Sequence, residues 1–107
     1  MADSNGAPKG LLMHGFGTGA EQAAGLPGAA VEIVIQGPAV AALTHDGGMA
    51  GPVASVLEGG VAVRACENSM RSAAVDAASL LTGVSPVPSA VVHLAQRQWD
   101  GWAYVRL

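Results

Sequence analysis

Apolar residues along this chain fall into short runs separated by glycine, proline and polar positions. The clearest run is Val31 to Ile35, where valine and isoleucine recur at alternate positions and Val34 adds another. A nearly continuous β-branched run of this length is typical of a strand that is buried on both faces of a parallel sheet. Similar runs predict four more strands, over 9–14, 61–66, 84–87 and 102–106. The strand at 84–87 is expected to be short and to lie at an edge, because two prolines lie nearby.

Helical segments are expected between these strands. The longest is Ala90 to Trp99, which follows Ser89, a residue that favours the N-cap position. Shorter helices or single turns are expected over 18–26, 39–43, 53–58, 69–75 and 76–81. Asn68 or Ser69 is the expected cap of the segment at 69–75. Strands that alternate with helices predict an α/β fold, with a parallel sheet covered by helices on both faces.

Three polar or reactive residues follow directly on expected strands or end them: His14, Gln36 and Cys66. Right-handed crossovers bring the C-terminal ends of all parallel strands to one edge of the sheet. That edge is where open α/β sheets bind their ligands. We therefore expect these three residues to share the functional edge of the sheet.

Composition narrows the possible functions. The 107 residues predict one domain over 9–107, preceded by a polar tail at 1–8. The net charge is −3 and the five Lys and Arg residues are scattered, which argues against a nucleic-acid partner. No apolar stretch approaches the roughly 20 residues that a membrane span needs, so no membrane partner is expected. The hydrophobic half of the chain is mostly Ala and Val, which favours close helix-on-sheet packing and coverage of some apolar surface by another subunit.

The single cysteine, Cys66, excludes an internal disulfide framework and the usual cysteine-rich zinc site. The three histidines lack paired acidic residues, so we expect neither a metal nor another cofactor. The glycine-rich segment at 15–19 lacks the residues of a nucleotide-binding loop and is interpreted as a tight turn. A lone thiol stays reduced in the cytoplasm, which is the expected location.

Three segments resemble the DsrE/DsrF-like (DsrEFH-like) family of intracellular sulfur-handling proteins. They are VEIVIQGPAV at 31–40, GVAVRACENSMR at 60–71 and VPSAVVHLAQRQWDGWAYVR at 87–106. The resemblance covers about nine-tenths of the chain in order and is weakest between residues 15 and 30. It implies a three-layer α/β/α fold around a five-stranded, mainly parallel sheet, and a homo-oligomer, commonly a trimer or hexamer. It also implies that Cys66 carries sulfane sulfur as a persulfide with Asn68 as its companion, whereas Arg64 departs from the family pattern.

The chemistry of a sulfur carrier requires an ionised and reachable thiol. Cys66 lies just before an expected helix, whose N-terminal N–H groups would lower the thiol pKa. Strand alternation places Arg64 on the same side, roughly 7 Å along the chain, where its charge could favour the thiolate or attract an anionic donor. The competing interpretation is a buried structural cysteine, because free cysteine packs as a small hydrophobic residue.

The neighbouring polar residues also have two interpretations each. Asn68 is either an N-cap or a hydrogen-bond partner of a persulfide, and Arg71 lies on the same helical face, suited to a salt bridge or an anion. His14 could act as a general base beside Cys66 if their strands are adjacent, and is otherwise a hydrogen-bonded structural residue. His93 has no evident partner in the sequence.

Two functions follow. The leading hypothesis is a cytoplasmic sulfur-relay protein, sulfurtransferase-like, in which Cys66 accepts sulfane sulfur from a donor protein and passes it to an acceptor thiol. The alternative is a non-catalytic oligomeric domain that binds a small ligand or a protein at the C-terminal edge of the sheet. An independent hydrolase has no Ser–His–Asp pattern behind it and is set aside.

Overall fold

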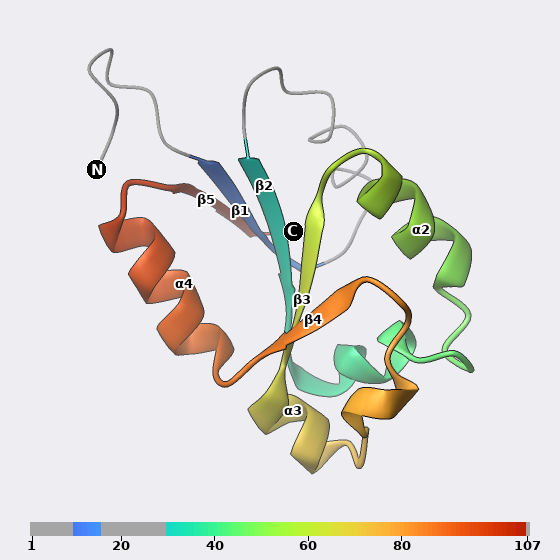
Figure 1. The fold of residues 1–107 in the computed structure, drawn as a ribbon. Coiled ribbons are helices and arrows are strands. Elements are labelled where there is room, and N and C mark those ends of the chain that lie inside the picture. The colour runs from blue at the N-terminus through green and yellow to red at the C-terminus, as the bar shows by residue number, and fades with distance from the viewer. Residues whose placement is uncertain (1–9, 16–29, 107) are drawn as a thin grey trace.

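Residues 10–15 and 30–106, which the computed structural model describes, form a parallel sheet with helices on both faces (Figure 1). The elements in chain order are β1 (Gly10–His14), β2 (Ala30–Ile35), the 3-10 helix η1 (Gly37–Leu43), α2 (Ala50–Glu58), β3 (Ala62–Cys66), α3 (Glu67–Ser72), the 3-10 helix η2 (Ala77–Ser79), β4 (Val84–Val87), α4 (Ala90–Trp99) and β5 (Ala103–Arg106). The five strands lie in the order β4-β3-β2-β1-β5, and every neighbouring pair is parallel. The predicted fold class, a three-layer α/β/α arrangement around a five-stranded sheet, is confirmed.

Strand β2 shows why this sequence makes a central strand. Val31, Ile33 and Ile35 point to one face of the sheet and join a large apolar cluster with α2 and η1. Val34 points to the opposite face and joins a smaller cluster under α4. Alternating β-branched residues therefore fill the core on both sides of the same strand, as a buried parallel strand requires. Figure 1 shows α4 on one side of the sheet and α2 on the other.

The ends of several helices differ from the sequence expectation. Helix α3 begins at Glu67 with Cys66 as its N-cap and no side-chain cap, so the prediction that Asn68 or Ser69 caps it is wrong. Helix α2 begins at Ala50, three residues before the expected start. Pro52 is tolerated in the first turn of this helix, because N–H groups there have no helical partner and proline lacks only that N–H. The expected turns at 39–43 and 76–81 are 3-10 helices.

Other expectations about the elements are met. Ser89 is the N-cap of α4, and its hydroxyl accepts a hydrogen bond from the Val92 N–H. Strand β4, which contains Pro86, lies at one edge of the sheet, where no strand needs the missing N–H. The expected helix at 18–26 and the expected tail at 1–8 fall outside the described residues. No helix in the described ranges has the length and apolar character that crossing a bilayer would need.

The crossovers change sides between β3 and β4. The connection after β3 contributes Met70 and Leu80 to the cluster on the α2 face. The connection after β4 is α4, which contributes Ala90 and Leu94 to the opposite face. Neighbouring parallel strands whose connections leave toward opposite faces open a crevice at their carboxyl ends, which is the usual ligand position in open α/β sheets. Cys66, the last residue of β3, stands at this point.

Candidate functional site

The sulfur of Cys66 lies between the first residues of two helices. Cys66 is the N-cap of α3, and the Ala90 N–H at the start of α4 donates a hydrogen bond to its Sγ at 3.4 Å. The side chain belongs to the smaller apolar cluster, with Val34, Ala90 and Leu94 among its members. Only 5% of the residue is exposed in the single chain. The site thus combines an apolar wall with N–H groups that point at the sulfur.

The hydrogen-bond donors around Cys66 lower the pKa of its thiol by more than burial raises it. Burial raises the pKa of the Cys66 thiol, but hydrogen bonds from the Ser69 hydroxyl and from the N–H groups of Ser69, Ala90 and Asn68 bring that pKa below its ordinary value of 9.0. The Ser69 Oγ accepts a hydrogen bond of 2.7 Å from the Gly37 N–H, which leaves the hydroxyl proton for the sulfur. A structural cysteine needs no such donors, whereas a thiolate does.

Replacing Ser69 with alanine is therefore expected to raise the pKa of Cys66, because the hydroxyl donor that favours the thiolate is removed. The titration can be followed by the ultraviolet absorbance of the thiolate. The matched control is Ser72→Ala on the same helix, where the hydroxyl donates to the Asn68 carbonyl instead. An unchanged thiol pKa in Ser69→Ala would contradict the assigned role of this hydroxyl.

Asn68 and Arg71 share a face of α3, as the sequence predicted. The Arg71 guanidinium donates to the Asn68 Oδ1, and both side chains are at the surface of the short helix. The contribution of Asn68 to the sulfur is its main-chain N–H rather than its side chain. Its amide is thus engaged by Arg71 in this state.

Arg64 lies on the same face of the sheet as Cys66, as expected, but its guanidinium forms an ion pair with Glu32. Its Nη2 donates to the Glu32 Oε2 at 3.2 Å. The structure gives no contact between this guanidinium and the sulfur among the described residues. The role predicted for Arg64, to favour the thiolate, therefore has no support in the geometry.

Glu32 is the centre of a charged network that the sequence analysis missed. Its carboxylate is buried between β2 and α4 and accepts hydrogen bonds from three side chains. Arg97 donates through Nε at 3.1 Å and Nη2 at 2.9 Å, and the His93 Nε2 lies 2.8 Å from Oε1. Burial raises the pKa of Glu32, but the hydrogen bonds of Arg97, His93 and Arg64 lower that pKa by more than burial raises it. The net shift is therefore downward.

Two signals in the sequence could have revealed this network. Glu32 is an acid inside an otherwise apolar strand, and a buried carboxylate requires partners. His93 and Arg97 are spaced four residues apart, so they share a face of α4. The statement that His93 lacks a partner is corrected by its contact with Glu32. Together these contacts fasten α4 to the sheet.

His14 and Cys66 are not neighbours. Strand β2 lies between the strands that carry them, which separates their ends by roughly two strand spacings, about 10 Å. The His14 Nδ1 instead lies 2.9 Å from the Tyr104 hydroxyl on β5. The adjacency that a Cys–His arrangement requires is absent, so the structure does not place His14 as a general base for Cys66.

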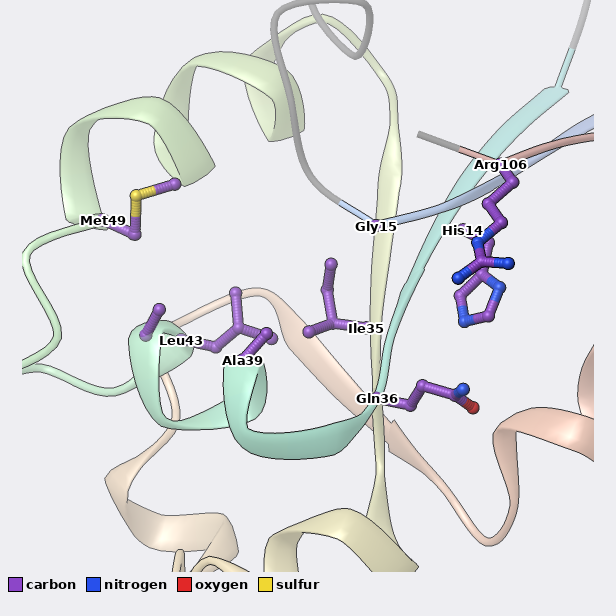
Figure 2. A pocket seen from close by; sticks show the side chains of 9 residues that line it. His14, Gly15, Ile35, Gln36, Ala39, Leu43, Met49 and Arg106 are labelled. Atoms are coloured by element: carbon purple, nitrogen blue, oxygen red, sulfur yellow. The ribbon is translucent and has the colours of Figure 1, made fainter.

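His14 does share the sheet edge with Gln36, as predicted. Both line a cavity of about 380 Å³ at the carboxyl ends of β1, β2 and β5, together with Arg106. Figure 2 shows His14, Gln36 and Arg106 on one side of the β2 ribbon and Ile35, Ala39 and Leu43 on the other. Arg106 was not singled out from the sequence, because nothing local indicates that β5 lies beside β1. The edge thus carries two separate features, this cavity and the buried sulfur of Cys66 with its hydrogen-bond donors.

Metal ligation has no basis in the described parts of the chain. Within residues 10–15 and 30–106, no group of three or more His, Cys, Asp or Glu side chains is arranged to hold a metal ion.

Comparison with known proteins gives a structural relative. No model of a known protein family matches the chain, and no curated protein matches it. A solved structure similar to this one is that of MTH1491, a protein of unknown function from Methanobacterium thermoautotrophicum. The two share 29% sequence identity over 91% of this chain and 96% of the other, with a TM-score of 0.77. The comparison supports the α/β fold, and the resemblance to DsrE/DsrF-like proteins stays a prediction.

Proposed function

We propose that this protein is a sulfur carrier of the DsrE/DsrF-like kind, and that Cys66 holds sulfane sulfur as a persulfide. The observation that carries the proposal is the set of hydrogen-bond donors around one sulfur atom. The Ser69 hydroxyl and the N–H groups of Asn68, Ser69 and Ala90 lower the pKa of a thiol that otherwise lies in a buried apolar cluster. Donors fixed in this way stabilise a sulfur anion without reorganisation.

The transfer is a sequence of two thiol–persulfide exchanges. The Cys66 thiolate attacks the outer sulfur of a donor persulfide, a Cys66 S–S bond forms, and the donor leaves as its thiolate. An acceptor thiolate then attacks the outer sulfur, the Cys66 S–S bond breaks, and Cys66 leaves as the thiolate. The sulfane sulfur keeps its oxidation state, so neither step needs an external oxidant or reductant. Because the chain has one cysteine, the second thiol belongs to a partner.

The route that we propose for the outer sulfur runs beside Ser69. A second cavity of about 380 Å³ is lined by Gly37, Pro38, Asn68 and Ser69, among others. Two of these residues supply donors to Cys66, so this cavity reaches the groups that surround the sulfur. Because Cys66 itself is buried, the approach of a donor requires the side chains between the cavity and the sulfur to move.

The proposal predicts that incubation with polysulfide adds the mass of one sulfur, about 32 Da, to the intact protein. The adduct is expected to disappear entirely in Cys66→Ser and on treatment with a small thiol. Intact-protein mass spectrometry measures it, and Ser72→Ala serves as a variant of the same helix that keeps the adduct. Absence of the adduct from the natural chain under conditions that modify a free cysteine peptide would overturn the relay function.

The low exposure of Cys66 favours one competing function. A thiol with 5% exposure is also compatible with a non-catalytic domain that binds a ligand or a protein at the sheet edge. Alkylation separates the two functions. A relay thiol reacts in the native protein, whereas a structural thiol reacts only after unfolding.

We also propose that the carrier forms a homo-oligomer, a trimer or a hexamer, and that its location is the cytoplasm. Large apolar side chains are exposed on α4 and β5, and the most exposed are Trp99 at 79% and Val91 at 70% on α4. Contacts between subunits would remove such surface from water. Donor and acceptor proteins are its further expected partners.

A further inference from the structure

We propose that the cavity at the carboxyl ends of β1, β2 and β5 binds a small organic carboxylate that carries an apolar chain. The inference is independent of the sulfur chemistry of Cys66, which lies at the end of β3. It rests on the division of the cavity wall into a polar and an apolar half.

The polar half carries hydrogen-bond donors and an arginine. His14 and Arg106 are paired residues of the neighbouring strands β1 and β5, so both side chains leave the sheet at the same level. Figure 2 shows the Arg106 guanidinium beside the His14 ring, with the Gln36 amide on the same side of β2. The Tyr104 hydroxyl engages His14 Nδ1, and within the described residues Nε2 has no protein partner. A guanidinium, an imidazole and an amide thus face one space.

The charge of Arg106 is not neutralised within the described residues. The carboxylate of Glu32 is taken by Arg64, Arg97 and His93, and no ion pair there involves Arg106. The described wall of the cavity contains no aspartate or glutamate. A planar guanidinium binds a carboxylate through two parallel hydrogen bonds, which gives both strength and orientation. The polar half therefore suits an anion, and it disfavours a cation.

The apolar half indicates what the anion is attached to. Ile35, Leu43 and Met49 line the cavity from β2, η1 and the residue that precedes α2, and Figure 2 shows Leu43 and Met49 on the side away from Arg106. Gly15 lines the space between the halves, with a φ of 109° that favours glycine. An inorganic anion would leave this apolar surface uncovered. The volume of about 380 Å³ is at the small end for ligand sites and fits a short chain.

The test uses hexanoate as the probe and the full-length protein. Titration calorimetry or ligand-detected NMR would compare hexanoate with acetate, which lacks the chain, and with hexanol, which lacks the charge. Hexanoate is expected to bind at least about tenfold more tightly than either analogue, because only hexanoate uses both halves of the cavity. Arg106→Gln is expected to weaken hexanoate binding by a similar factor.

The control is Arg71→Gln, which removes the same charge from an exposed arginine of α3 outside the cavity. It is expected to leave hexanoate binding unchanged, as is Cys66→Ser, and circular dichroism would verify that each variant is folded. Hexanoate binding that is undetectable in the natural chain, equal to that of hexanol, or equal in Arg106→Gln would overturn the proposal. None of these results bears on persulfide formation, so the relay function is tested separately.

Discussion

Replacing Glu32 with glutamine is expected to lower the free energy of unfolding by roughly 3 kcal/mol, since removing one partner of a buried ion pair strands the other. Glu32 is 4% exposed, and its carboxylate accepts four hydrogen bonds from three side chains. An amide of nearly the same shape presents an NH₂ group where an acceptor oxygen was, and it carries no charge opposite Arg64 and Arg97. The arginines retain some solvent contact, which keeps the cost near the lower end for such substitutions.

Urea unfolding followed by circular dichroism measures this loss. The control is Glu58→Gln at the exposed end of α2, where the change is expected to stay within about 0.5 kcal/mol. A loss from Glu32→Gln no larger than that of the control would show that the network contributes little to stability.

The same experiment has a defined dependence on pH. The pKa of Glu32 in the folded protein lies below its ordinary value of 4.5, so the unfolded chain takes up a proton first as the pH falls. The stability from the ionised carboxylate is therefore fully present above pH 4.5 and is lost as the pH falls through the lower folded value. The difference between the natural chain and Glu32→Gln is expected to be constant near neutrality and to shrink on acidification. A difference that grew toward acid pH would have the wrong sign for a depressed carboxyl pKa.

The layered fold could be predicted because its signals are local. Alternating β-branched residues at 31–35 identify a strand buried on both faces, and Ser89 marks the start of α4 by a hydroxyl that caps it. The prolines near 84–87 place β4 at an edge, because a strand without one N–H cannot lie between two others. Each inference needs only a few neighbouring residues, and each is confirmed.

The site could be predicted only in part because it depends on strand order. The rule that parallel strands end at one edge correctly brings His14, Gln36 and Cys66 to the same edge, but it does not say which strands are adjacent. The order β4-β3-β2-β1-β5 separates His14 from Cys66 and places His14 beside Arg106. Ser69 acts on the sulfur because α3 begins two residues earlier than its predicted start, a helix boundary that propensity defines poorly.

Replacing Gly10 with alanine is expected to destabilise the fold by about 1–3 kcal/mol, through a contact that reaches the Glu32 network. A Cβ on Gly10 would lie 2.5 Å from two carbons of the Trp102 ring, too close for either to remain in place. The Arg97 guanidinium lies over that ring, 4.8 Å from its centroid, and the same guanidinium holds Glu32 with two hydrogen bonds. Displacing the indole therefore removes a cation–π contact and weakens the two hydrogen bonds from Arg97 to the buried carboxylate of Glu32.

The matched control is Gly51→Ala in α2, where an added Cβ meets nothing within 4 Å. Alanine in a helix is favoured over glycine, so this variant is expected to be more stable by up to about 1 kcal/mol. If the two substitutions had the same effect, the indole would have room to move and the proposed coupling would be absent. If Gly10→Ala also reduces the loss caused by Glu32→Gln in the double variant, the two sites act through Arg97, because a weakened contact can be lost only once.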